Sequence, residues 1–184
     1  VAALNGAIAS ALAAMVAGLT IGKKGYEDTG EIMKHIQSLA LTQKTGFVAD
    51  IDRDSEAYNK VFDCFRLPKN TDEEKAIRSA AIQEATKFAA LVPMQVARNA
   101  YELMGIIADV AKLGNRNAVT DACVAMMSAR SAVLGALMNV RINLGSLKDK
   151  TFVEQLQSEA DELEHKTCVK EKELLDAINQ DLRI

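Results

Sequence analysis

The chain has 184 residues, of which 49% are apolar and only 4% aromatic, and its formal net charge at pH 7 is -3. This length fits one domain, or a domain plus one long helical arm, and is enough to bury a core; we expect a single domain spanning residues 1–184. The longest basic run is Lys23-Lys24, which argues against a nucleic-acid partner, because such proteins carry basic stripes with stacking aromatics.

The apolar content is rich in alanine, and the chain has only two prolines. Alanine is the best helix former, whereas strands prefer β-branched and aromatic residues. Composition therefore predicts an all-α fold. The three cysteines, Cys64, Cys123 and Cys168, are odd in number and lack C-x-x-C spacing. They predict reduced, non-catalytic thiols and a cytoplasmic location.

Helical periodicity predicts six or seven helices, taken here in chain order. The first is the uncharged run Ala2–Thr20, which stops at Gly22. Its alanine and glycine content favours a helix packed among other helices over a membrane span or signal peptide. The second begins at residues 28–29 and ends at Pro68, with a break expected around residues 46–52.

The second half of the chain continues the helical pattern. Thr71-Asp-Glu-Glu74 is a capping box that starts a helix, and Pro93 fits the first turn of another, which Gly114 closes. A nearly apolar helix runs from Ala118 to Leu144, and a long amphipathic helix starts at Thr151. The two least polar helices hold more small apolar surface than their neighbours can cover, which predicts a homodimer or higher homo-oligomer.

An asparagine pair interrupts the apolar helix. Asn139 and Asn143 lie one turn apart on one helix face, while Arg141 points the other way. Asparagine is a poor helix-interior residue, and burying an amide without partners costs a few kcal/mol. The pair is therefore either satisfied inside a core, for example by a neighbouring helix, or directed at a ligand. The sequence leaves both readings open.

A run of carboxylates precedes the middle of the chain. On a helix Asp50 and Asp54 would be neighbours, with Asp52 turned away by about 200°. Most such runs are solvated helix starts. The functional alternative is a carboxylic acid in a half-buried cleft that both takes and gives a proton. The two histidines, His35 and His165, lack metal-ligand spacing, so no metal is expected.

Several short strings together identify a family. In chain order they are Ala2-Ala-Leu-Asn-Gly-Ala7, Leu19-Thr-Ile-Gly-Lys-Lys24, Asp54-Ser-Glu-Ala-Tyr58, Phe65-Arg-Leu-Pro-Lys-Asn70, Gly114-Asn115 with Thr120-Asp-Ala122, and Asn139-Val-Arg-Ile-Asn-Leu144. They resemble the cyclodeaminase domain of formiminotransferase-cyclodeaminase and the related stand-alone bacterial methenyltetrahydrofolate cyclohydrolases. The resemblance covers nearly the whole chain and implies an all-helical, dimeric enzyme.

The resemblance also implies roles for individual residues. Asp54 falls on the catalytic aspartate of the family's Asp-x-Glu-Ala-aromatic motif. The expected folate-binding residues are Asn139, Asn143, Asp121, Lys23, Arg66 and Lys69. The two asparagines would orient the pterin or the reacting carbon, and the cations would meet the glutamate tail. The family's Pro-Gly-Gly-Gly-Ser segment before the first helix has no counterpart in this sequence, which puts part of the ligand cradle in question.

The implied activity is that of a cyclodeaminase, which converts 5-formiminotetrahydrofolate to 5,10-methenyltetrahydrofolate and ammonia. Its alternative is the cyclohydrolase reaction, which gives 10-formyltetrahydrofolate, and a non-enzymatic helical interaction module is a further alternative. No cofactor is expected beyond the tetrahydrofolate substrate, with or without a polyglutamate tail. Because helix rise separates Asp121 from Asn139 by about 27 Å, the sequence also raises a site shared between subunits.

Overall fold

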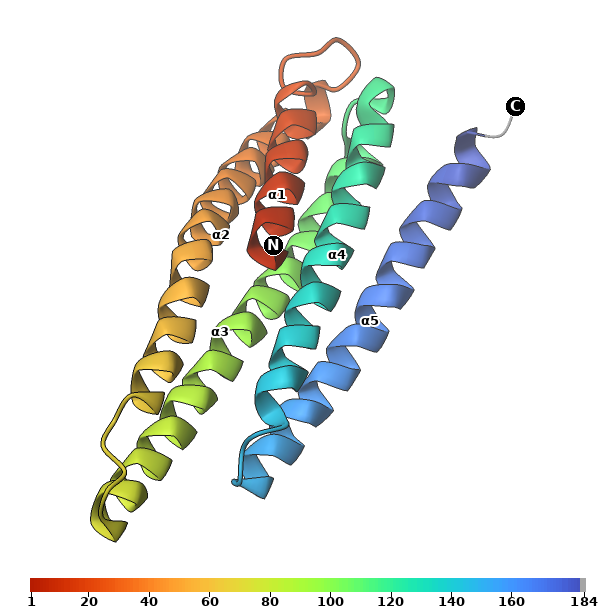
Figure 1. Cartoon of the computed structure of the whole chain (residues 1–184). Helices are drawn as coiled ribbons and strands as arrows, with labels where there is room; N and C mark the ends of the chain where they lie inside the picture. The colour runs from red at the N-terminus through yellow and green to blue at the C-terminus, as the bar shows by residue number, and fades with distance from the viewer. Residues whose placement is uncertain (183–184) are drawn as a thin grey trace.

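The computed structural model describes residues 1–182 (Figure 1). Within these residues the chain forms five long α-helices and no strand. The helices are α1 (Ala2–Gly18), α2 (Gly30–Phe65), α3 (Asp72–Leu113), α4 (Val119–Leu144) and α5 (Lys150–Leu182), with short 3-10 helices η1 (Glu27–Thr29) and η2 (Arg116–Ala118). The predicted all-α fold is confirmed, with five long helices in place of six or seven.

The count is lower because two expected breaks do not occur. α2 continues through residues 46–52, and α3 continues through Pro93. An exposed glycine such as Gly46 lowers helix stability by about 1 kcal/mol without ending the helix. An interior proline removes one backbone hydrogen bond, which a long helix survives when other groups compensate. By contrast, the capping box at Thr71 and Glu74 forms as predicted.

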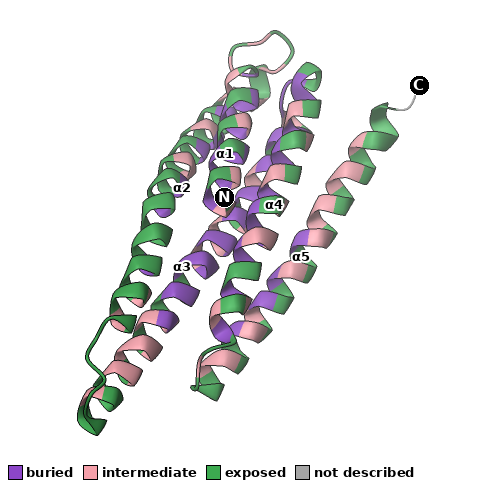
Figure 2. Cartoon of the chain, viewed as in Figure 1, coloured by how far each residue is buried: buried purple, intermediate pink, exposed green. Residues whose placement is uncertain are grey.

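α1 lies between α2 and α4, with one face left exposed (Figure 1). It packs against α2, α3 and α4, whereas α5 packs on α4 and, to a lesser extent, on α3 (Figure 1). The N-terminus of α1 lies partway along α2, so the lower parts of α2 and α3 continue past it as a hairpin (Figure 1). Buried residues concentrate where α1, α3 and α4 meet, and the hairpin is largely exposed (Figure 2).

Small residues allow α1 to approach its neighbours closely. Gly6 faces the fully buried ring of Phe47 on α2, and a Cβ added to Gly6 would lie 2.7 Å from that ring. Ala9, Ala13 and Ala17 are fully buried along the same helix. The alanine and glycine content of the first helix therefore serves helix packing, as predicted.

The C-terminal end of α1 is tied to the turn between α3 and α4. The backbone N–H of Asn115 donates to the Thr20 hydroxyl at 2.8 Å, and its side-chain amide donates to the Leu19 carbonyl at 3.3 Å. Lys23 donates from Nζ to Asn115 Oδ1 at 2.9 Å. A Cβ on Gly114 would clash with the Val110 carbonyl oxygen and would lie 3.3 Å from Thr20 Oγ1, so this turn requires glycine. We call these contacts the Thr20–Asn115 clasp.

One segment, Arg116–Leu144, is long and apolar enough to cross a membrane by length and composition. Its buried face, which includes Ala125, Ala129 and Ala136, packs inside the bundle against α1 and α3. This is the arrangement of a core helix. The other side of α4 exposes Val124 and Met138, and α1 likewise exposes apolar side chains.

Candidate active site

A cavity of about 130 Å³ opens at the N-terminal end of α1. Four helices and the chain's first residue contribute to its walls. The lining residues are Val1, Ala2, Ala3, Asp50, Ile51, Asp54, Ser55, Pro93, Val96, Ala136 and Asn139. The fold thus brings together Asp54 and Asn139, two predicted site residues that lie far apart in the sequence.

Two carboxylates face this cavity from α2. Asp54 is exposed, and Asp50, one helical turn earlier, is only 4% exposed. Both line the cavity and Asp52 does not, as helix periodicity predicts. Asp50 Oδ1 accepts a hydrogen bond from Arg53 Nη1 at 2.9 Å. This ion pair compensates part of the cost of burying the carboxylate.

Asp50 is the site residue that sequence reasoning did not select. Its spacing from Asp54 was visible in the sequence, and that spacing correctly placed both side chains on one helix face. Its burial depends on the residues that α1 brings against α2, which a linear pattern does not reveal. The cavity consequently presents a pair of carboxylates to one apolar wall formed by Pro93, Val96 and Ala136.

The two asparagines have different surroundings: one borders the cavity, where a ligand could bind, and the other forms hydrogen bonds between helices. Asn139 is exposed and lines the cavity from α4, opposite the carboxylates of α2. Asn143 is half-buried and does not line it. The Asn143 amide nitrogen donates to the Ala89 carbonyl of α3 and to the Asn139 carbonyl, both at 3.0 Å. One amide therefore borders the cavity, and the other joins two helices.

The remaining predicted residues lie away from the cavity. Lys23 takes part in the Thr20–Asn115 clasp at one end of the bundle. Asp121 is half-buried in the first turn of α4, about 27 Å along the helix from Asn139. Within one protomer, a single small ligand bound at the cavity cannot contact both Asn139 and Asp121.

Arg66 and Lys69 occupy the α2–α3 turn at the opposite end of the bundle. Arg66 donates from Nη1 to Asp63 at 3.2 Å and lies over the Phe62 ring, with its Cζ 4.7 Å from the ring centroid. The turn is about 18 Å along α2 from Asp54. A ligand bound at Asp54 would reach Arg66 only through an extended tail.

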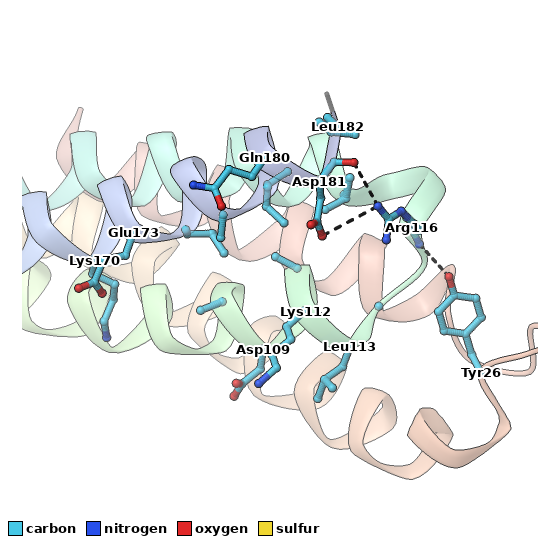
Figure 3. Close-up of a pocket in the computed structure, with 17 residues that line it drawn as sticks. Tyr26, Asp109, Lys112, Leu113, Arg116, Lys170, Glu173, Gln180, Asp181 and Leu182 are labelled. Atoms are coloured by element: carbon cyan, nitrogen blue, oxygen red, sulfur yellow. Dashed lines mark hydrogen bonds and ion pairs between the residues drawn. The ribbon is translucent and has the colours of Figure 1, made fainter. Parts of the chain in front are cut away.

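A larger cavity, of about 700 Å³, lies between the C-terminal end of α3, the start of α4 and the last turns of α5 (Figure 3). The backbone N–H of Arg116 donates to the Tyr26 hydroxyl at 3.0 Å, and its guanidinium donates to the Asp181 carbonyl at 3.3 Å. Lys112 and Lys170 also border it. None of the predicted site residues lines this cavity.

Metal binding and thiol chemistry have little support among the residues that the structure describes. No group of three or more His, Cys, Asp or Glu side chains among residues 1–182 could hold a metal ion together. The cysteines are unpaired and half-buried, and burial raises the pKa of the Cys123 thiol. A raised pKa makes the nucleophilic thiolate scarcer at neutral pH.

The fold and the smaller cavity define an all-helical protein with carboxylates and an amide clustered at the N-terminal end of α1. Residues 1–162 match the family model described as formiminotransferase-cyclodeaminase. The chain belongs to this family. The resemblance drawn from the sequence strings is thereby confirmed, and the α5 wall of the larger cavity, which begins at Lys170, lies beyond the matched residues.

Individual relatives carry two names. A methenyltetrahydrofolate cyclohydrolase of Methylorubrum extorquens is 42% identical over 166 residues, which cover 88% of this chain and 78% of that protein. A formimidoyltransferase-cyclodeaminase of Mus musculus is 31% identical over 155 residues, which cover 84% of this chain and 29% of the mouse protein. The chain therefore matches less than a third of the mouse protein.

A solved structure supports the fold. The crystal structure of formiminotetrahydrofolate cyclodeaminase from Thermotoga maritima superimposes with a TM-score of 0.80 at 30% sequence identity. The match covers 96% of this chain and 86% of the Thermotoga chain. The relatives found by sequence and by structure are folate-processing enzymes.

Proposed function

We propose that this chain catalyses a reaction of the one-carbon unit between N5 and N10 of tetrahydrofolate, with hydrolysis of 5,10-methenyltetrahydrofolate to 10-formyltetrahydrofolate as the favoured reaction. Identity of 42% to a cyclohydrolase, against 31% to the mouse cyclodeaminase, supports this preference. The cyclodeaminase reaction, which the sequence strings suggested first, is the second candidate, and the name of the Thermotoga structure supports it. An interaction module without activity is disfavoured by the enzyme relatives.

The single observation that carries the proposal is the pairing of Asp54 with Asn139 across the cavity. The bridging carbon of a methenyl group belongs to a cationic amidinium and is open to attack by water. In the proposed mechanism Asp54 takes a proton from that water as its oxygen bonds to the carbon. The bond from carbon to N5 then breaks, and Asp54 returns the proton to N5. The remaining hydroxyl proton on the tetrahedral carbon is released to solvent as the formyl C=O forms. The formyl group remains on N10.

The surroundings suit a cationic substrate. Asp50 and Asp54 place two carboxylates on the α2 side of the cavity, and a negative site attracts a positive ligand. In this mechanism the Asn139 amide, which borders the cavity, donates to the oxygen that becomes the formyl carbonyl. The mechanism requires no cofactor beyond the tetrahydrofolate substrate.

In the cyclodeaminase reaction the same carboxylate would serve different atoms. N10 would attack the carbon of the protonated formimino group, whose nitrogen becomes an amino group, and lose its proton to Asp54. The carbon–nitrogen bond to the amino group would then break, with the proton delivered to the departing ammonia. Both reactions pass through a tetrahedral carbon, so both can use one acid/base carboxylate.

We further propose that a second protomer completes the site. The cavity of about 130 Å³ is well below the roughly 300–1,000 Å³ of typical ligand pockets. On α1, exposed apolar side chains recur at helical spacing, at Leu4, Ile8, Met15 and Leu19. A two-fold dimer would cover this face.

We propose that two protomers contribute folate-binding residues to one site. Arg66 and Lys69 lie on the same helix and turn as Asp54 and are proposed to meet the glutamate tail, with or without further glutamates. Lys23 and Asp121 could approach the same ligand only from a partner protomer. We propose a cytoplasmic location, which the unpaired cysteines support.

The test offers each folate separately to the purified protein and follows methenyl absorbance and ammonia. Loss of methenyl absorbance faster than in buffer, without ammonia, is the expected result. Release of ammonia with a gain of methenyl absorbance from 5-formiminotetrahydrofolate would favour the second candidate. If neither folate reacts faster than in buffer, the proposed function is wrong.

A further inference from the structure

Pro93 leaves the Ala89 carbonyl, in the middle of α3, without a backbone donor in its own helix. In an α-helix the carbonyl of residue 89 accepts from the N–H of residue 93, and proline has no N–H. Ala89 is buried, with 8% of its surface exposed. A buried carbonyl without a donor costs free energy, so the continuous α3 requires a replacement donor.

Asn143 supplies that donor from another helix. Its amide nitrogen lies 3.0 Å from the Ala89 carbonyl oxygen. The same nitrogen lies 3.0 Å from the Asn139 carbonyl in its own helix, so both amide hydrogens have acceptors. The side chain therefore crosses from α4 to α3 at the carbonyl that Pro93 leaves open.

We infer that Asn143 is a positioning residue, which takes the place of the missing backbone donor of Pro93 and thereby fixes α4 against α3 beside the cavity. Pro93 and Val96 of α3 and Ala136 and Asn139 of α4 line that cavity. Asn143 itself does not. It acts on the reaction through the placement of Asn139 and the Pro93 wall, without touching the ligand.

This inference makes Pro93 and Asn143 a functional pair. With alanine at position 93 the backbone N–H returns and can bond to the Ala89 carbonyl, so Asn143 becomes dispensable. Gln83 of α3 makes a comparable contact with the α4–α5 turn: its amide nitrogen donates to the Ser146 carbonyl at 3.0 Å, and its amide oxygen accepts from the Lys148 N–H at 2.7 Å. Gln83 lies about 15 Å along α3 from Pro93 and provides a matched control.

The experiment is a double-mutant cycle of Asn143→Ala with Pro93→Ala, measured by denaturant unfolding. We expect Asn143→Ala alone to raise the unfolding equilibrium constant roughly 5- to 150-fold, the effect of one buried unsatisfied group. In the Pro93→Ala background the same change should have an effect at least three-fold smaller. Gln83→Ala should have equal effects in both backgrounds, because distant sites add.

Steady-state kinetics with 5,10-methenyltetrahydrofolate, under conditions where every variant is folded, supply the functional readout. We expect Asn143→Ala to lower kcat/KM and Pro93→Ala to recover part of that loss, whereas the loss caused by Asn139→Ala should not be recovered. Equal losses of folate affinity for Asn143→Ala in both backgrounds would make Asn143 a ligand contact and overturn the inference. So would an unfolding constant unchanged by Asn143→Ala.

The inference rests on the proposed function only for this kinetic readout. If no folate reacts, the unfolding cycle still decides whether Asn143 replaces the missing donor. If the folates react but the cycle shows no coupling between positions 93 and 143, the positioning role fails and the proposed function stands.

Discussion

The upper and lower halves of the bundle are built on different principles. In the upper half α1 fills the space between α2, α3 and α4 with small residues, and contacts such as that of Gly6 with Phe47 leave no spare room. In the lower half α1 is absent, α2 lies beside α3 with a largely exposed surface, and α3 also contacts the α4–α5 turn, where the Gln83 amide nitrogen donates to the Ser146 carbonyl (Figures 1 and 2). The cavity with Asp54 and Asn139 lies at the boundary, where α1 begins.

A helical bundle of this kind can hold a reactive site only where its packing leaves space for a substrate. A close-packed core has no space for substrate, and the part of the α2–α3 hairpin beyond α1 is largely exposed to water. The end of an inserted helix offers both walls and an opening. Changes in the upper half should therefore alter stability, and changes at the boundary should alter activity. Changes at exposed positions of the hairpin, other than Arg66 and Lys69, should be tolerated.

The largest expected effect is at the boundary. Replacing the exposed Asp54 with asparagine removes the proposed acid/base, so kcat should fall by about 10²- to 10⁴-fold while the unfolding midpoint stays close to that of the parent. Asp52→Asn is the matched control, since Asp52 points away from the cavity. Comparable kcat values for the two variants would remove Asp54 from the mechanism.

A second test addresses the exposed apolar face of α1. Ile8, which is 43% exposed, should lie in the proposed dimer interface, and a charge there would be buried without a partner. Ile8→Lys should shift the protein to monomer in light scattering and lower activity. Val169→Lys places the same charge on an exposed apolar position of α5 and should leave the dimer intact. A parent protein that is monomeric and active would contradict the proposed dimer.

A third test compares two glycines. Gly6→Ala would place its Cβ 2.7 Å from the Phe47 ring, and overpacking of this kind typically costs about 1–3 kcal/mol of unfolding free energy. Gly46→Ala on α2 meets nothing within 4 Å and should stabilise the protein by up to about 1 kcal/mol. Chemical denaturation of both variants measures the contrast. Effects of the same sign would refute it.

The smallest expected effect concerns an ion pair between α3 and α5. Arg98 donates to Glu159 through two nitrogens at 2.6 and 2.7 Å, and these hydrogen bonds lower the pKa of the Glu159 carboxyl. A lowered folded-state pKa stabilises the fold above the ordinary glutamate pKa, and the contribution is lost as pH falls through the lowered value. Both side chains are partly exposed, so the contribution should be below about 1 kcal/mol.

The measurement for this pair is the unfolding midpoint of the parent and of Glu159→Gln from neutral to acid pH. The parent should be the more stable at neutral pH, and the difference should shrink as Glu159 becomes protonated. A difference that stays constant across the series would show that the carboxylate charge does not contribute.

Local patterns predicted what local physics determines. The capping box at Thr71 needs only residues within one turn, and it formed as expected. The shared face of Asp50 and Asp54 follows from helix periodicity alone. The family strings added the activity class, which no periodicity could supply.

Features that depend on neighbouring helices were not predictable. Pro93 was expected to begin a helix, and it instead lies inside α3, where Asn143 from α4 satisfies the carbonyl that it leaves open. The same contact separates the roles of Asn139 and Asn143, which the sequence treated as one pair. Lys23 was expected near the glutamate tail, and within the protomer it belongs to the Thr20–Asn115 clasp.

The clasp has a consequence for the order of folding. Thr20 and Asn115 are 95 residues apart in the sequence, whereas α2 with α3 and α4 with α5 are neighbours joined by short turns. Closing a long loop costs more entropy than closing a short one, so sequence-local hairpins generally form first. Because α1 and α2 are also neighbours in the sequence, we expect them to pair early and the clasp between the end of α1 and the α3–α4 turn to close late. Since the N-terminal end of α1 and Asn139 of α4 line the same cavity, the appearance of activity during refolding would time the docking of these segments.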